Sequence, residues 1–210
     1  MTDPRTVAAK LRLLADHLVI DDLTDEQWGA LDQRLADALG DLPADGPDRT
    51  RFARAFDPVT APGELAMPTH SIAQGSSAII PPLDLVFSDD DTRLVVRTTV
   101  GSAWEGPPGL VHGGFVAATF DMGLSALATR VLAHSVTRWI RVRYLKPTTL
   151  GSELRYELEV DGSPEGRLLD LRGTLYADDR VTARATAQFA VVDSARFGHA
   201  VPSAGDSGQG

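Results

Sequence analysis

One acidic side chain stands inside the longest apolar stretch of the chain. Between Val111 and Thr129, Asp121 is the only residue with a fixed charge at neutral pH. Burying an unpaired carboxylate is costly, so such a residue needs hydrogen-bond partners or a function. Buried backbone groups, Thr119 or Ser125 would satisfy the carboxylate structurally. The other interpretation is a catalytic base, and the stretch taken alone leaves both open.

A histidine and two glycines, His112-Gly113-Gly114, come directly before the helix expected in this stretch. Glycines allow close approach to the backbone, and the first N–H groups of a helix have no partner within it. These groups and the partial positive charge of the helix N-terminus would stabilise an oxyanion formed from a carbonyl group. The alternative for His112 is a core histidine that bonds the backbone.

The spacing between these two features predicts how they meet. Asp121 follows His112 by nine residues, which is about 13 Å along a helix axis. That distance is too long for Asp121 to act on a carbonyl group held at the start of its own helix. Antiparallel packing of two copies would bring the aspartate of one copy to the glycines of the other. The spacing therefore predicts a dimer with shared active sites.

The surrounding sequence has the period of two that is typical of strands. Leu94, Val96, Thr98 and Val100 alternate with more polar residues before the helix. The order of strands, one buried helix and further strands predicts an α+β architecture in which an antiparallel sheet wraps around the helix. Asp178-Asp179 is the expected turn between the last two strands. The strands expected after the helix cover 137–145, 153–160, 168–177 and 181–192.

The first of these later strands gathers cations in a chain that is otherwise acidic. Arg138, Arg141, Arg143 and Lys146 lie close together with no acid between them. They would bind the phosphates of an anionic ligand or pair with glutamates of the next strand. Arg143 and Lys146 are the expected ligand contacts, because strand ends open to loops. Strict alternation sets Thr137, Trp139, Arg141 and Arg143 on one face, and Arg138, Ile140, Val142 and Tyr144 on the other.

The chain divides into three predicted parts. Residues 1–75 form a helical extension with a proline-rich linker, 76–193 the main domain, and 194–210 a disordered tail. Two amphipathic helices are expected at 6–19 and 25–39, the second capped by Thr24 or Asp25. Their apolar stripes, which include Val7, Leu11, Leu14 and Leu18 in the first helix, would pack on the main domain or contact a partner.

Composition excludes several classes of function. The chain has 210 residues, a formal net charge of −9 and no cysteine. The acidic balance argues against nucleic-acid binding, and the lack of cysteine excludes disulfides and thiolate sites. His112 and Asp121 lower the hydrophobicity of the apolar stretch and argue against a membrane span there. The N-terminus does not have the pattern of a secretory signal, so we expect a cytoplasmic protein. A G-x-S-x-G serine elbow is also missing.

The segment Glu105-Gly106-Pro107-Pro108-Gly109-Leu110-Val111-His112-Gly113-Gly114, followed by Asp121, resembles the hotdog-fold acyl-CoA thioesterases of the PaaI-like family and their THEM relatives. The resemblance covers about residues 78–193 and leaves out the first 75. It implies a hotdog fold, dimers that join two sheets, and hydrolysis of acyl-CoA or related acyl thioesters. It also implies that no metal or other cofactor takes part. Pairing of dimers into tetramers stays open.

The resemblance further implies roles for single residues. Asp121 would be the general base or nucleophile, and the Gly113 N–H the oxyanion donor, with help from His112. The Thr137 hydroxyl would assist the attacking water. The expected substrate contacts are Gly114, Arg143 and Lys146.

Two other functions are compatible with the same fold. A hydratase or dehydratase of this type would need a histidine five residues after the aspartate, where this chain has Ala126. A non-catalytic acyl-CoA-binding or assembly module would use the dimer and the helical N-terminus. Four apolar side chains would either line an acyl groove or belong to the core, namely Phe115, Phe120, Met122 and Trp139.

Overall fold

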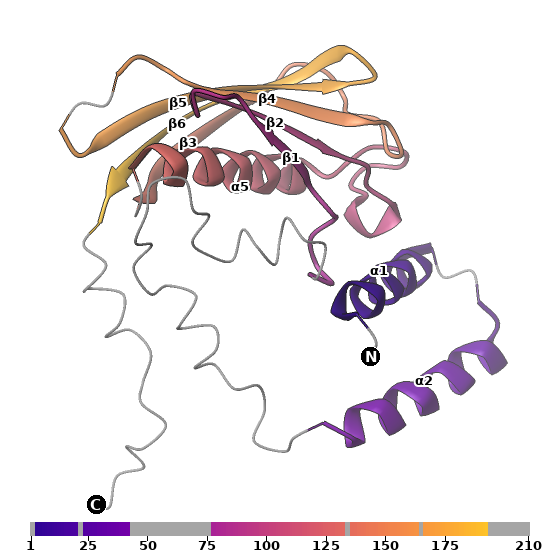
Figure 1. The fold of residues 1–210 in the computed structure, drawn as a ribbon. Coiled ribbons are helices and arrows are strands. Elements are labelled where there is room, and N and C mark those ends of the chain that lie inside the picture. The colour runs from indigo at the N-terminus through magenta and orange to yellow at the C-terminus, as the bar shows by residue number, and fades with distance from the viewer. Residues whose placement is uncertain (1–2, 21–22, 43–76, 133–134, 164–165, 193–210) are drawn as a thin grey trace, which may run out of the picture.

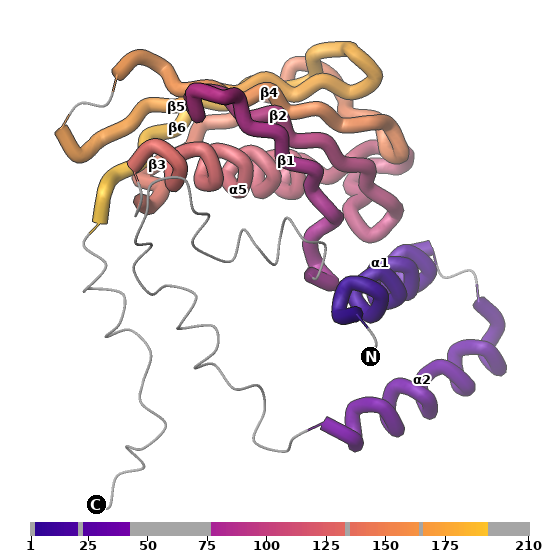
Figure 2. The backbone as a smooth tube through the Cα atoms, viewed as in Figure 1, coloured from indigo at the N-terminus to yellow at the C-terminus, as the bar shows by residue number. Residues whose placement is uncertain are grey.

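The computed structural model describes residues 3–20, 23–42, 77–132, 135–163 and 166–192. The predicted linker and the predicted tail lie outside the described residues. Within them, one long helix lies along one face of a six-stranded sheet, and two helices precede this unit (Figures 1 and 2). The predicted α+β hotdog architecture with a helical N-terminal extension is confirmed.

All neighbouring strands of the sheet are antiparallel, in the order β1-β2-β4-β5-β6-β3. Asp178 and Asp179, the expected turn between β5 and β6, have φ values of 46° and 63°, as a type I′ turn requires at both central residues. The strands are β1 (Asp84–Phe87), β2 (Arg93–Thr98), β3 (Ser135–Tyr144), β4 (Leu154–Val160), β5 (Leu168–Ala177) and β6 (Arg180–Val191).

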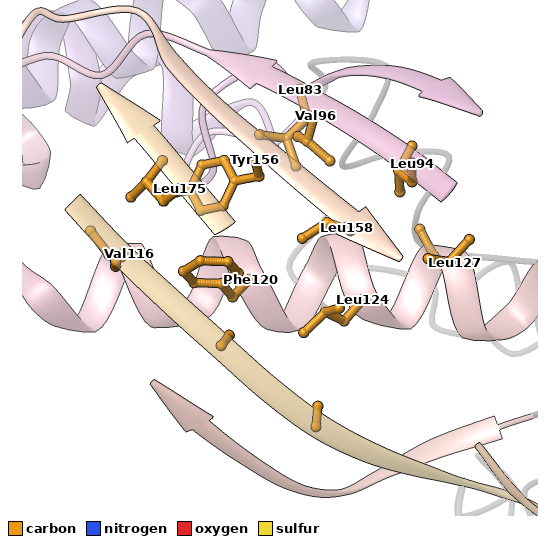
Figure 3. Packing of buried hydrophobic residues seen from close by; sticks show 14 of the residues in the cluster. Leu83, Leu94, Val96, Val116, Phe120, Leu124, Leu127, Tyr156, Leu158 and Leu175 are labelled. Atoms are coloured by element: carbon orange, nitrogen blue, oxygen red, sulfur yellow. The ribbon is translucent and has the colours of Figure 1, made fainter. Parts of the chain in front are cut away.

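The core lies between the sheet and helix α5 (Gly113–Leu132) (Figure 3). Phe120, Leu124 and Leu127 of α5 are fully buried against Leu158 and other strand residues that the alternation placed on the inner face. The helix comes so close to the sheet that a Cβ on Gly123 would lie 2.5 Å from Leu158. A larger residue at this position would force the buried Leu158 side chain to shift, so glycine allows the close packing of α5 on β4.

By length and composition, α5 resembles a membrane-spanning helix, with a mean hydropathy of 1.3. Its buried positions include Val116, Phe120, Leu124 and Leu127, which face the sheet (Figure 3). The core helix of a sheet that wraps around it needs the same apolar composition. The hydropathy of α5 is therefore explained by its place in this core.

Strand β3 is an edge strand whose side chains depart from strict alternation. Its register with β6 shifts between Thr137 and Trp139, so Arg138 is the extra residue of a β-bulge. One inserted residue reverses the direction of the side chains before it. Thr137 therefore faces α5, on the same side as Ile140, and Arg138 is exposed and bonds Gln188. The expectation that Thr137 shares a face with Trp139 is wrong for this reason.

The helical extension consists of α1 (Pro4–Ile20) and α2 (Asp25–Gly40). Thr24 caps α2 with a capping box to Gln27, as one of the two expected caps. The predicted apolar stripe of α1 does not pack on the main domain, because Val7, Leu11 and Leu18 are 48%, 42% and 58% exposed. Helix α1 instead approaches the 3-10 helix η1 (Ser102–Trp104) through a neighbouring face.

Candidate active site

The backbone around His112 is fixed by a loop that folds back on itself. The His112 N–H donates to the Trp104 carbonyl at 2.8 Å, and the Val111 N–H donates to Thr148 at 2.9 Å. Gly106 is needed at the close approach, since a Cβ there would lie 2.9 Å from the His112 Cα. The start of α5 is thus held in place by its neighbours in the loop.

At the start of α5 the two glycines differ in their hydrogen bonds. The Gly114 N–H donates to His112 Nδ1 at 3.0 Å, so this ring nitrogen acts as an acceptor. His112 is exposed, and the core-histidine alternative is therefore wrong. Among the described residues, no acceptor bonds the Gly113 N–H. A ligand oxygen could therefore bind the Gly113 N–H at the positive end of the helix.

Tyr144 is a residue of this region that the sequence reasoning missed. Its hydroxyl donates to the Gly113 carbonyl at 2.6 Å, and its ring carbons lie 3.3–3.4 Å from where a Cβ on Gly113 would stand. Tyr144 thus fixes the peptide unit after the donor, and a side chain at position 113 would press on its ring. Alternation placed Tyr144 on the same face as Ile140 and Val142, but it gave no sign of the bond to Gly113.

Asp121 and Thr137 meet between α5 and β3. The Thr137 hydroxyl donates to Asp121 Oδ1 at 2.9 Å, and both residues are half-buried. Neither expected structural donor bonds the carboxylate: Thr119 donates to the Phe115 carbonyl instead. Among the described residues, Asp121 Oδ2 has no protein donor. One carboxylate oxygen is therefore oriented by the protein, and the other can accept a proton from water.

The site residues predicted from sequence lie in two separate groups, one at the start of α5 and one beside its middle. His112, Gly113 and Gly114 lie at its start, whereas Asp121 bonds Thr137 more than two turns further along. At 1.5 Å per residue the two groups are about 13 Å apart along the axis. A single chain does not bring them together.

Arg143 and Lys146 lie at the exposed end of β3. Arg143 points to the face of the sheet opposite α5, because its neighbour Tyr144 contacts Gly113 of that helix. Arg143 also stands directly opposite Arg184 of β6. Like charges in such a pair repel unless an anion binds between them.

The proposed pairing of these cations with the glutamates of the next strand is wrong. The neighbour of β3 is β6 rather than β4, which carries the glutamates. Each of those glutamates bonds an arginine elsewhere in the sheet. The pairs are Glu153 with Arg97, Glu157 with Arg155, and Glu159 with Arg172.

An apolar cavity of about 250 Å³ lies beside the first half of α5. Among the expected groove residues, Phe115 and Met122 line it, whereas Phe120 is fully buried in the core and Trp139 is 43% exposed on β3. The Tyr156 phenol also faces the cavity, and burial raises its pKa, so it stays protonated. The remaining lining comes from Ile79, Ile80, Pro81, Val100, Trp104, Val111, Ala118, Thr119 and Leu154.

Comparison with known proteins gives the same fold. The sequence profile of the thioesterase superfamily matches residues 108–162. The crystal structure of a thioesterase superfamily protein is similar with a TM-score of 0.71 and 21% identity, over 90% of this chain and 91% of that chain. The structure of the PaaI protein of the E. coli phenylacetic acid degradation operon gives a TM-score of 0.49 at 15% identity, and the match covers 53% of this chain and 80% of that chain. The crystal structure of a hypothetical thioesterase with coenzyme A from Streptococcus pneumoniae TIGR4 gives a TM-score of 0.49 at 20% identity, and the match covers 52% of this chain and 85% of that chain.

No curated protein matches the sequence at a significant level. The similarity at a TM-score of 0.71 shows the hotdog fold. The profile match over residues 108–162 agrees with the resemblance to thioesterases that the sequence predicted for this part of the chain. That structural similarity covers 90% of the chain. It therefore extends into the N-terminal region, which the sequence resemblance left out.

Proposed function

We propose that this protein hydrolyses acyl-CoA or related acyl thioesters. The observation that carries this proposal is the Asp121–Thr137 pair, in which the one acidic side chain of the core helix is oriented by a hydroxyl. A carboxylate with one oriented oxygen and one open oxygen suits a base that takes a proton from water. The Gly113 N–H supplies a donor for the other half of the reaction.

The proposed reaction needs only these groups and water. Asp121 takes a proton from a water molecule, and the water oxygen bonds to the thioester carbonyl carbon. The carbonyl oxygen becomes an oxyanion that the Gly113 N–H stabilises, with the positive end of α5 behind it. The carbon–sulfur bond then breaks, and the leaving thiolate takes up the proton that Asp121 holds. This step frees the acid product and restores the Asp121 carboxylate. In the alternative mechanism, the Asp121 carboxylate itself attacks the thioester carbonyl carbon and displaces the thiolate. Water then hydrolyses the mixed anhydride that has formed.

Two features of the structure support a site shared between two copies of the chain. Within the described residues, no strand pairs with the outer edge of β3, so alternate residues along this edge present N–H and C=O groups without a strand partner. Helix α5 also carries a half-buried or exposed row of small residues beside Asp121, at Gly114, Ala118 and Ser125. Pairing of two β3 edges would join the sheets and let the two α5 helices approach closely.

In this arrangement the Asp121 of one copy serves the Gly113 of the other. The apolar cavity lies next to Gly113, because Phe115 and Ala118 of the same helix line it. We propose that this cavity takes the acyl group. Gly114 leaves room for the thioester beside it, and Lys146, just beyond the end of β3, contacts phosphates of the coenzyme. Arg143 was expected to do the same, but it points to the opposite face of the sheet.

A panel of thioesters tests the activity directly. Purified protein should release free thiol from acyl-CoA substrates between acetyl and dodecanoyl, or from phenylacetyl-CoA. The rate for at least one acyl group should exceed that of the Asp121→Ala variant by about a thousandfold. If no substrate gives thiol above the Asp121→Ala background, the proposal is wrong, and binding of unhydrolysed acyl-CoA in the same samples would favour a binding module.

The Thr137 hydroxyl has a smaller expected effect than the carboxylate. Thr137→Ala should lower kcat about tenfold to a hundredfold, because an orienting hydrogen bond is worth about 1–3 kcal/mol. Thr137→Ser keeps the hydroxyl and should stay within about threefold of the wild type. The thiol-release rates of the two variants decide the matter. Equal losses in both would show that the methyl group, and not the hydroxyl, is what Asp121 needs.

A further inference from the structure

Helix α1 holds one wall of the apolar cavity. The Ala103 N–H of η1 donates to Asp16 Oδ1 at 2.7 Å. The next residue of η1, Trp104, is buried and lines the cavity. The contact is so close that a Cβ on Gly101 would lie 2.6 Å from the Asp16 carboxylate. Asp16 therefore fixes the position of η1 and of the indole that η1 carries.

The same helix holds a second wall, the segment of residues 77–81. The Arg12 guanidinium, one turn before Asp16, donates to the Ser77 carbonyl. The Ser77 hydroxyl in turn accepts the N–H groups of Ile79 and Ile80 at 3.2 and 3.1 Å, which gives this segment its turn. Both isoleucines line the cavity.

The two walls are tied to each other as well. Trp104 Nε1 donates to the Ile79 carbonyl at 3.2 Å. Ile79 itself is 76% exposed, so it stands at the mouth of the cavity rather than in the core. The segment 77–81 precedes β1 and has no strand partner within the described residues. The bonds from Trp104 and from Arg12 therefore hold the segment on the side of α1. On its other side Pro81 is buried, and the Thr98 hydroxyl donates to the Pro82 carbonyl.

We propose that α1 is a positioning element that sets the size of the acyl group accepted by the cavity, with Asp16 and Arg12 as its positioning residues. This inference rests on the proposed thioesterase function. A cavity of about 150 Å³ holds benzene, so a cavity of about 250 Å³ has room for an apolar group of up to about ten carbons. The substrate class is then a medium-chain aliphatic or a phenyl-bearing acyl thioester.

Loss of the α1 contact should act on long acyl groups more than on short ones. An acetyl group reaches only the glycine end of the site, whereas an octanoyl group contacts Trp104 and Ile79. In Asp16→Ala the ratio of kcat/KM for octanoyl-CoA over acetyl-CoA should fall about tenfold, mainly through KM for octanoyl-CoA. Asp16→Asn keeps an acceptor oxygen for the Ala103 N–H and should restore the ratio. Asp32→Ala, the same change at an exposed position of α2, is the control.

A binding measurement separates this inference from the proposed activity. With Trp28 and Trp139 replaced by Phe, Trp104 is the single tryptophan and reports on the cavity. Its emission should shift on titration with octanoic acid, and Asp16→Ala should weaken that binding about tenfold.

The outcomes are distinct. If the wild type hydrolyses no thioester but Trp104 reports octanoic acid binding that depends on Asp16, the proposed activity fails and the role of α1 stands. If hydrolysis is normal and the ratio is the same in Asp16→Ala, Asp16→Asn and Asp32→Ala, the role of α1 is wrong and the activity stands. Equal loss for acetyl-CoA and octanoyl-CoA in Asp16→Ala would also overturn it.

Discussion

Asp121→Asn should lower the turnover of the best thioester substrate about a thousandfold or more while the fold stays intact. Asparagine has the shape of aspartate, and its oxygen can still accept the 2.9 Å hydrogen bond from Thr137. What the variant loses is the negative charge that takes a proton from water, and general bases contribute roughly 10²–10⁴-fold. The expected loss therefore appears in kcat rather than in KM.

The matched control for this variant is Asp170→Asn. Asp170 is an exposed residue of β5 that bonds Gln188 on the face of the sheet away from α5. The same chemical change there should leave thiol release within about twofold of the wild type. Melting temperatures of the two variants should agree within a few degrees. Activity of Asp121→Asn within about tenfold of the wild type would remove Asp121 from the catalytic role.

Much of the fold followed from local patterns. The alternation of Leu94, Val96 and Thr98 predicted a strand, and all three side chains are buried on one face of the sheet. The apolar stretch around Asp121 predicted the core helix, because only a sheet that wraps around such a helix can bury it. These features follow from the spacing of residues that are close together in the sequence, so they could be predicted from one sequence alone.

Features that depend on distant segments could not be predicted. The bulge at Arg138 reverses the direction of Thr137, and no residue type near it signals an inserted position in the strand pairing. The contact of Asp16 with Ala103 spans 87 positions of sequence. The stripe of α1 was expected to be its packing face, but α1 binds η1 through a polar contact instead. Apolar periodicity indicates which face of a helix can be buried, but it does not indicate a polar contact with a distant segment.

The second large effect is the recovery of activity when two inactive variants form mixed dimers. Gly113→Val should be inactive, because its side chain would crowd the Tyr144 ring, which lies 3.3–3.4 Å from the Cβ position. It would also block the approach of a thioester to the N–H. Asp121→Asn lacks the base. Each parent should retain about 1% of the wild-type rate or less.

Mixing these two variants tests the shared site most directly. In a mixed dimer one site carries both defects and the other carries neither, so it should have about half of the wild-type activity. Random exchange makes about half of all dimers mixed, and the pooled sample should therefore recover about a quarter. The measurement is thiol release after co-refolding, with mixed dimers verified by native mass spectrometry. Recovery to about a quarter is the predicted result, whereas a rate no higher than the sum of the two parents would place the whole site within one chain.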